Sequence, residues 1–404
     1  MTHRLPSEVY VTYIASKELA QISALLPSNK KRSLIVHSLA SSLGVLSNVA
    51  KEGLRAEIRV VNPVPASYEE LATYHSRDYL EFVLDPKNSR GIDALEGAEY
   101  GLEDDCPPFP GLPHYVRYIA GATLTAVREL REGRSRIAIC WDGGRHHAQK
   151  SKAAGFCYVA DCVLAILALR RLAPDPRDHS KLRKPRVMYL DLDVHFSDGV
   201  CSAFQNSSSS SGTSTFLHFS IHHAAPGFFP ASPLSTLPSL TSDPFLLSLP
   251  LNRGASNATI RRIWLNVVEK IREAFVPDYV VLQCGVDGLA GDPTAVWNWG
   301  LGGDGGIGWC VGRVLEWDVP TLLLGGGGYN SPNAARAYAY LTSIARGGPL
   351  PLDTPLSHEL YAPSFELDVP PGNMQDSNTG EYLNEVEKIY WGIVEEIRER
   401  CSRS

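Results

Sequence analysis

The sequence predicts a single α/β domain, residues 1–404, with a central and mostly parallel sheet of about eight strands flanked by helices. Three observations predict this fold. Short runs rich in Val, Ile, Leu and Tyr recur along the whole chain, longer segments with helical spacing lie between many of them, and the chain contains no internal repeat. Strands that are apolar throughout are buried on both faces, and helical connections between such strands make neighbours parallel. A length of 404 residues also allows two domains, but the even spread of the strand candidates favours one sheet.

The predicted strands are short and poor in charge. In chain order they cover residues 9–14, 57–61, 136–140, 187–194, 215–221, 245–249, 279–284 and 320–324. Segments with apolar residues three and four positions apart predict helices. These cover residues 31–46, 114–132, 158–172, 257–275, 305–317, 332–345 and 382–400.

Three segments interrupt this alternation and predict loops. Residues 206–213 read NSSSSSGT, a low-complexity insertion between a helix and a strand. Residues 226–244 are dense in Pro and Ser, and residues 370–379 precede the last helix. Because loops at the carboxyl ends of strands carry the chemistry in open α/β sheets, reactive residues are sought there.

Composition excludes several classes of protein. The net charge is −6, from 38 Lys and Arg against 44 Asp and Glu, which argues against broad binding to nucleic-acid phosphates. The eight cysteines form no CxxC pair, so we expect buried free thiols and a reducing compartment. Neither a signal peptide nor a run of about 20 apolar residues is found, and we therefore expect a soluble intracellular protein without membrane association.

A cluster of metal-ligand residue types follows the predicted strand at 187–194. Asp191, Asp193 and His195 alternate there, so neighbouring pairs can share a face in extended backbone. The strand at 279–284 is followed by Asp287, a third ligand. Two carboxylates and one imidazole leave an open position for water on Zn²⁺, as a catalytic site requires. The alternative for Asp198 and Asp287, each followed by glycine, is a capping or turn role.

Two other strand ends carry polar groups beside glycines. Gly143-Gly144 precedes Arg145 and the paired His146-His147, and imidazoles near a metal-bound water can act as general base and acid. Four glycines, 325–328, precede Tyr329, whose phenol can donate a hydrogen bond to an oxyanion. The alternative role for Tyr329 is that of a core tyrosine.

Taken together, these segments closely resemble the zinc-dependent histone deacetylase family, in its class I branch, within the arginase-like fold. The matching segments occur in the family's order and span nearly the whole chain: residues 31–39, 141–148, 155–158, 191–199, 226–230, 290–293 and 324–330.

The resemblance implies a role for each matching residue. Asp193, His195 and Asp287 would ligate Zn²⁺, with Fe²⁺ as the alternative metal in the cell. His147 would activate the water and later protonate the leaving amine, His146 would assist electrostatically, and Tyr329 would stabilise the oxyanion. Asp191 and Asp198 would orient the two histidines, as carboxylates behind an active site usually do.

The resemblance also implies a substrate channel and a second cation. Phe156 and Phe229 would flank the lysine stem, Gly155 would offer its carbonyl to the acetyl-lysine amide, and Asp105 on the rim would accept substrate amides. Arg32 would lie near the foot of the pocket where acetate leaves. A structural K⁺ would be bound by Asp191, Asp193, His195, Ser220 and Ile221, several through backbone oxygens.

The chain departs from the family pattern at a few positions. Phe196 and Ser197 replace the His and Gly of the family's HHGDG segment, and the glycine change matters if that position needs φ > 0. A glycine-rich turn becomes Ala231-Ser232-Pro233, and Thr294 stands where a larger apolar residue often walls the pocket. These changes bear on substrate preference and rate more than on reaction type.

The sequence thus favours a metal-dependent lysine deacetylase acting on acetylated histone tails or other proteins. The alternatives are an acetylpolyamine amidohydrolase and a weakly active scaffold in a corepressor complex. Corepressor subunits are the expected partners, direct nucleic-acid binding is not expected, and the expected location is the nucleus, the cytoplasm or both. Residues 181–186, KLRKPR, are a weak import signal and more often a solvated loop.

Overall fold

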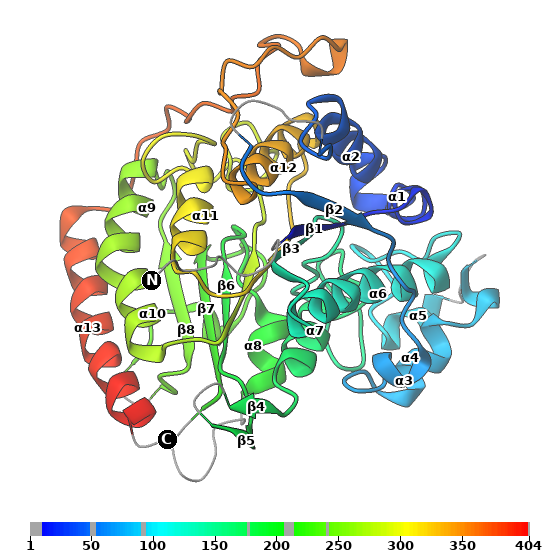
Figure 1. Cartoon of the computed structure of the whole chain (residues 1–404), viewed down its shortest axis with the longest axis horizontal. Coiled ribbons are helices and arrows are strands. Elements are labelled where there is room, and N and C mark those ends of the chain that lie inside the picture. The colour runs from blue at the N-terminus through cyan, green and yellow to red at the C-terminus, as the bar shows by residue number, and fades with distance from the viewer. Residues whose placement is uncertain are drawn as a thin grey trace, which may run out of the picture.

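The computed structural model describes residues 10–48, 54–89, 94–175, 178–205, 214–239 and 242–402. Within them, eight strands form one sheet in the order β2-β1-β3-β10-β9-β6-β7-β8, and every neighbouring pair is parallel (Figure 1). The strands are β1 (Tyr10–Ile14), β2 (Ile58–Val61), β3 (Ser135–Cys140), β6 (Val187–Asp191), β7 (Phe216–His223), β8 (Leu246–Leu251), β9 (Tyr279–Gln283) and β10 (Thr321–Leu324). Every predicted strand belongs to this sheet, so the predicted fold class is confirmed.

Each predicted helix is present with small shifts at its ends. These helices are α2 (Arg32–Ser42), α6 (Leu112–Arg131), α7 (Asp161–Leu169), α9 (Asn257–Ile263), α10 (Glu269–Phe275), α11 (Ile307–Glu316), α12 (Ser331–Ala345) and α13 (Gly380–Ser402). A π-helical turn, Trp264–Val268, joins α9 and α10 into the single helix predicted at 257–275. Shorter helices were not predicted: α1 (Lys17–Ser23), α3 (Tyr68–Leu71), α4 (Arg77–Val83), α5 (Ala94–Glu99) and α8 (Asp198–Phe204).

The sheet separates two apolar cores because alternate strand residues face opposite sides. In β6, Met188 and Leu190 belong to one core, whereas Val187 and Tyr189 belong to the other. The first core is completed by α2 and α9–α13, and the second by α1, α4, α6 and α7 (Figure 1). Burial on both faces is the physical reason that the central strands, such as β6, are largely apolar.

Two predictions about local structure were wrong. The strand predicted at 187–194 ends at Asp191, because carboxylates take over the backbone N–H groups that follow: Asp191 accepts the N–H of Asp193 at 3.0 Å, and Asp287 that of Val194 at 2.9 Å. The segment predicted as a solvated loop at 181–186 is strand as far as Arg183. There β4 (Ala173–Asp175) and β5 (Asp178–Arg183) form an antiparallel hairpin, held by a bidentate ion pair of Arg183 with Asp278.

The predicted loops differ in how far the structure describes them. The Ser-rich insertion at 206–213 lies outside the described residues. The segment 226–244 contains one short turn of 3₁₀ helix, η3 (Pro233–Ser235), and 370–379 is irregular and leads into α13. Within the described chain, the cysteines are free thiols and all but Cys401 are buried. No helix of the described segments is both long and apolar enough to cross a lipid bilayer.

The strand order determines where the polar segments meet. Strands β3, β10, β9, β6 and β7 are consecutive in the sheet, and parallel strands present their carboxyl ends at one edge. The segments that follow them therefore converge on one edge of the sheet, although they are widely separated in sequence.

Candidate metal and catalytic site

Asp193, His195 and Asp287 form a compact set of possible metal ligands. One ligand atom from each lies within 4.8 Å of the others. Among the described residues, no other group of three or more His, Cys, Asp and Glu side chains brings its ligand atoms this close together. The Nδ1 atom of His195 lies 3.1 Å from Oδ1 of Asp193 and 2.9 Å from Oδ2 of Asp287. Both carboxylates are buried.

Each carboxylate uses one oxygen to fix its position. Oδ2 of Asp193 accepts the backbone N–H of Gly327 at 2.7 Å and the side-chain amide of Gln283 at 3.1 Å. Oδ1 of Asp287 accepts the backbone N–H of Val194 at 2.9 Å. The second oxygen of each is thereby directed toward His195.

The chemistry of this set fits a divalent cation. Burial raises the pKa of Asp287, and the adjacent negative charge of Asp193 raises it further. Two carboxylates held this close in a buried site favour a positive charge between them. Oxygen and nitrogen ligands in this number match a catalytic zinc site that keeps one position open.

His146 and His147 lie beside the set, each held at Nδ1 by a carboxylate. The Nδ1 of His146 is 2.9 Å from Asp191, and that of His147 is 2.6 Å from Asp198. The two rings lie 4.0 Å apart, and His147 is 5.9 Å from the ring of His195. Because Nδ1 is occupied in both, the Nε2 atoms are the ones available for proton transfer.

The two histidines differ in charge state. Burial lowers the pKa of His147 to about 4, and the neighbouring His146 adds to this effect. Burial acts in the same direction on His146, but the carboxylates of Asp191 and Asp193 outweigh it and raise its pKa to about 9. These shifts favour a neutral His147 beside a protonated His146.

Aromatic rings surround the metal-ligand set on its open side. Tyr329 packs against Phe156 at 5.7 Å between ring centroids, and its ring is 6.5 Å from that of His195. Phe229 packs edge-on against His147 at 4.8 Å and is 42% exposed, so it reaches the surface. The predicted catalytic and wall residues are therefore brought together.

Three other predicted residues have contacts that refine their expected roles. Asp105 accepts the backbone N–H of Gly155 at 2.9 Å, which ties the rim loop to the pocket. Arg32 is buried and donates to the carbonyl oxygens of Gly326 at 2.9 Å and Gly328 at 3.0 Å, so it holds the glycine segment. Arg145 lines a small cavity together with His146, His147 and Tyr329, and Arg32 is not among the residues that line it.

The predicted K⁺ ligands come from the ends of adjacent strands. Asp191 pairs with Ser220 in the ladder between β6 and β7, and Ile221 follows directly. Asp193 and His195 lie just past the end of β6. The fold therefore brings this set to the same edge of the sheet.

Sequence reasoning missed several supporting residues. Asp161 accepts the backbone N–H groups of Gly144 at 2.9 Å and Arg145 at 2.7 Å, and so fixes the turn before the histidines. Gln283 holds Asp193, and Asp292 holds Tyr329 through its backbone N–H. Two sequence signals could have revealed some of these residues. Gln283 is a glutamine at the end of an apolar strand, and Asp161 is an aspartate at the start of an apolar helix.

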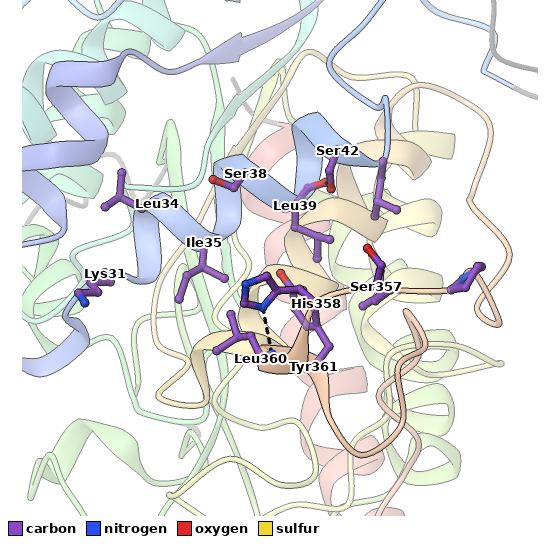
Figure 2. Close-up of a pocket in the computed structure, with 13 residues that line it drawn as sticks. Lys31, Leu34, Ile35, Ser38, Leu39, Ser42, Ser357, His358, Leu360 and Tyr361 are labelled. Carbon is purple, nitrogen blue, oxygen red and sulfur yellow. Dashed lines mark hydrogen bonds between the residues drawn. The ribbon is translucent and has the colours of Figure 1, made fainter.

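A second hollow lies apart from this site, between α2 and residues 355–361 (Figure 2). It has a volume of about 640 Å³ and an apolar lining that includes Leu34, Ile35 and Leu360. Figure 2 shows His358 among the lining side chains, where its Nδ1 accepts the backbone N–H of Leu360 at 3.0 Å. None of the predicted metal-binding or catalytic residues lines this groove.

Comparison with known proteins agrees with the site. A family model described as a histone deacetylase domain matches residues 26–345. The chain belongs to the histone deacetylase family. It is 37% identical over 390 residues to Histone deacetylase 8 of Xenopus tropicalis, which covers 95% of this chain and 98% of the relative. Histone deacetylase 8 of Danio rerio is 36% identical over 380 residues, 93% of each chain.

Membership of the histone deacetylase family gives the reaction class. The chain is a metal-dependent lysine deacetylase, a hydrolase that acts on acetyl-lysine. More distant deacetylases match as well, such as Histone deacetylase 2 of Oryza sativa subsp. japonica, which is 34% identical over 363 residues, 89% of this chain and 66% of the relative. The predicted resemblance is thereby confirmed.

Proposed function

We propose that the chain hydrolyses N6-acetyl-lysine in histone tails or other proteins, with Zn²⁺ held by Asp193, His195 and Asp287. The observation that carries the proposal is the placement of two carboxylate-bound histidines directly beside this set, with a tyrosine across from them. A divalent ion bound here would polarise the acetyl carbonyl and lower the pKa of a water molecule.

His147 has the features of the proton carrier. It is neutral because burial lowers its pKa, and Asp198 on Nδ1 fixes the ring so that Nε2 can accept a proton from the attacking water. The same Nε2 then delivers the proton to the lysine nitrogen as the amide C–N bond breaks. Burial lowers the pKa of His146, but the carboxylates of Asp191 and Asp193 outweigh this effect and raise the pKa to about 9. A protonated His146 would contribute positive charge beside the developing oxyanion.

Tyr329 is the proposed oxyanion donor. Burial holds its pKa well above the usual range, and the negative charge of Asp287 acts in the same direction, so the phenol keeps its proton. A protonated phenol can donate a hydrogen bond to the oxygen of the tetrahedral intermediate.

The substrate would enter between Phe156 and Phe229. A stem of four methylenes without charge suits aromatic walls, and the Gly155 carbonyl would accept the amide N–H. Asp105 would accept substrate backbone amides through its second oxygen, because Oδ2 already binds Gly155. The exposed Glu103 and Asp104 extend the acidic rim that a basic histone tail would meet.

The remaining assignments follow from the same site. Fe²⁺ is the alternative metal, K⁺ is proposed at the ends of β6 and β7, and acetate is proposed to leave past the cavity that Arg145 lines and the glycine segment that Arg32 holds. Residues 1–404 are proposed to act as one catalytic domain. Corepressor subunits are the proposed partners, in the nucleus, the cytoplasm or both.

A turnover assay with metal analysis tests the proposal. The purified chain should deacetylate an acetylated histone peptide, a hydroxamate chelator should block this, and Tyr329→Phe should reduce turnover by orders of magnitude while Zn²⁺ stays bound. Acetylspermidine, assayed in parallel, separates the acetylpolyamine alternative. Unchanged turnover in Tyr329→Phe would contradict the assigned role, and activity that survives Asp287→Ala would contradict the metal site.

A further inference from the structure

Phe196 and Ser197, the two residues that depart from the family's HHGDG segment, both contact His218 on β7. The hydroxyl of Ser197 lies 2.8 Å from Nε2 of His218, and the ring of Phe196 packs edge-on against the imidazole at 5.8 Å and 82°. All three side chains are buried. The departures therefore belong to one contact.

Ser197 occupies the N-cap position of α8 but does not cap it. A serine there normally accepts a backbone N–H of the first helical turn through its hydroxyl. Here the side chain makes no cap hydrogen bond, and its hydroxyl is directed to β7. Its backbone carbonyl still accepts the N–H of Cys201 at 2.9 Å, so the helix begins normally.

The backbone at Ser197 does not require glycine. Its φ is −77° and its ψ is 63°, outside the left-handed region. A serine can thus replace the family's glycine without backbone strain, and its hydroxyl adds a bond that a glycine cannot make.

This bond acts next to the catalytic histidines. The residue after Ser197 is Asp198, which holds Nδ1 of His147. The other partner in the bond, His218, stacks on Tyr189, which is its register partner on β6, with ring centroids 5.8 Å apart and 18° between the planes. The hydroxyl of Tyr189 donates to Asp191 at 2.5 Å, and the same carboxylate oxygen binds His146.

We propose that Ser197 and His218 are positioning residues, whose mutual hydrogen bond fixes the turn that carries Asp198 and thereby orients His147. The proposal rests on the proposed function, in which His147 carries the proton. It assigns the bond a role in the chemical step rather than in substrate binding, because neither residue lines the cavity beside His146, His147 and Tyr329.

Steady-state kinetics on an acetyl-lysine peptide test this proposal. Ser197→Ala and His218→Leu should each lower kcat roughly tenfold, the size expected for one lost buried hydrogen bond, with KM and zinc content unchanged. The double variant should be no slower than either single one. His218→Gln, whose side-chain amide can reach Ser197, should restore most of kcat, and it provides the test if His218→Leu does not fold. Ser202→Ala, an exposed serine on α8, is the matched control.

The outcomes separate this proposal from the proposed function. If the wild-type chain is active and His147→Ala strongly lowers turnover, but Ser197→Ala leaves kcat unchanged, the positioning role alone is wrong. Additive losses in the double variant, or a further loss on adding Ser197→Ala to His147→Ala, would also overturn it. An inactive wild-type chain, or one indifferent to His147→Ala, would contradict the proposed function instead.

Discussion

The carboxylate of Asp292 accepts the backbone N–H of Tyr329 at 2.7 Å. The same oxygen accepts the N–H of Asn330 at 3.2 Å, and the other accepts the N–H of Thr294 at 3.0 Å. The hydroxyl of Thr294 in turn donates to the carbonyl oxygen of Asp287 at 2.6 Å. One buried carboxylate therefore connects the segment of a metal ligand with the segment of the proposed oxyanion donor.

Asp292→Asn should lower kcat roughly tenfold to a hundredfold. The carboxylate accepts N–H groups on both oxygens, whereas an amide has one acceptor oxygen, so either the N–H groups of Tyr329 and Asn330 or that of Thr294 would face an NH₂. The substitution keeps the volume of the side chain, so zinc content should not change. Steady-state kinetics with metal analysis measure both quantities. Asp304→Asn, at an exposed position, is the matched control. If Asp292 acts through Tyr329, the substitution should have no further effect in a Tyr329→Phe background, and an additional loss there would contradict the link.

Gly155→Ala should abolish most turnover. The backbone there has a φ of +53°, and a Cβ would lie 2.4 Å from Cδ2 of His147 and 2.9 Å from Cε1 of Phe229. The added methyl would push the proton carrier and one aromatic wall apart. Gly227→Ala is the matched control, since its φ is +80° but no atom lies within 4 Å of the added Cβ. Peptide turnover of the two variants should differ at least tenfold, and equal loss in both would show that backbone strain alone decides the effect.

Removing the metal should stop turnover and lower the melting temperature together. Without a cation, Asp193 and Asp287 remain as two carboxylates in a buried site, where burial and the negative charge of Asp193 disfavour ionisation of Asp287. After dialysis against a chelator has removed the metal, the addition of stoichiometric Zn²⁺ should restore both properties. Thermal unfolding and a peptide turnover assay measure them. Metal affinity should weaken as the pH falls, because the ligands must lose their protons to bind. Full activity after complete removal of metal would exclude the assignment.

The sheet could be predicted from the sequence because strands that are buried on both faces are short apolar runs. Residues Val187–Leu190 of β6 have no charged position and are buried on both faces of the sheet, in two different cores. Asp193, His195 and Asp287 were predictable because strand ends in such a sheet meet at one edge. The contacts of Ser197 with His218, and of Asp292 with Tyr329, were not, because they depend on register and on turn geometry that no local pattern records. The β4–β5 hairpin was missed because it is polar and is held by an ion pair to Asp278, distant in sequence.

The last prediction concerns His75, whose two ring nitrogens are both engaged. Nε2 accepts the backbone N–H of Ala160 at 3.0 Å, and Nδ1 lies 3.1 Å from the carbonyl oxygen of Lys150, so the neutral ring with its proton on Nδ1 fits the site. Burial lowers the pKa of His75 to about 4, against an ordinary value of 6.5. As the pH falls from 6.5 toward 4, the unfolded chain takes up a proton here that the folded chain does not. This group therefore lowers the free energy of unfolding by roughly 3 kcal/mol across that window, and adds no further pH dependence below it.

His75→Gln removes the titrating group and should flatten this part of the pH profile. Chemical denaturation at pH 7 and pH 5 measures the effect: the loss of stability between the two should be smaller in the variant by roughly 2 kcal/mol, which is 1.5 pH units at 1.4 kcal/mol each. The variant should also be less stable at pH 7, because the acceptor for the N–H of Ala160 is displaced. His114→Gln, which removes an exposed imidazole from α6, controls for the loss of a histidine. An unchanged difference between pH 7 and pH 5 in His75→Gln would mean that the acid sensitivity of the fold arises at other buried histidines, such as His218 and His222 on β7.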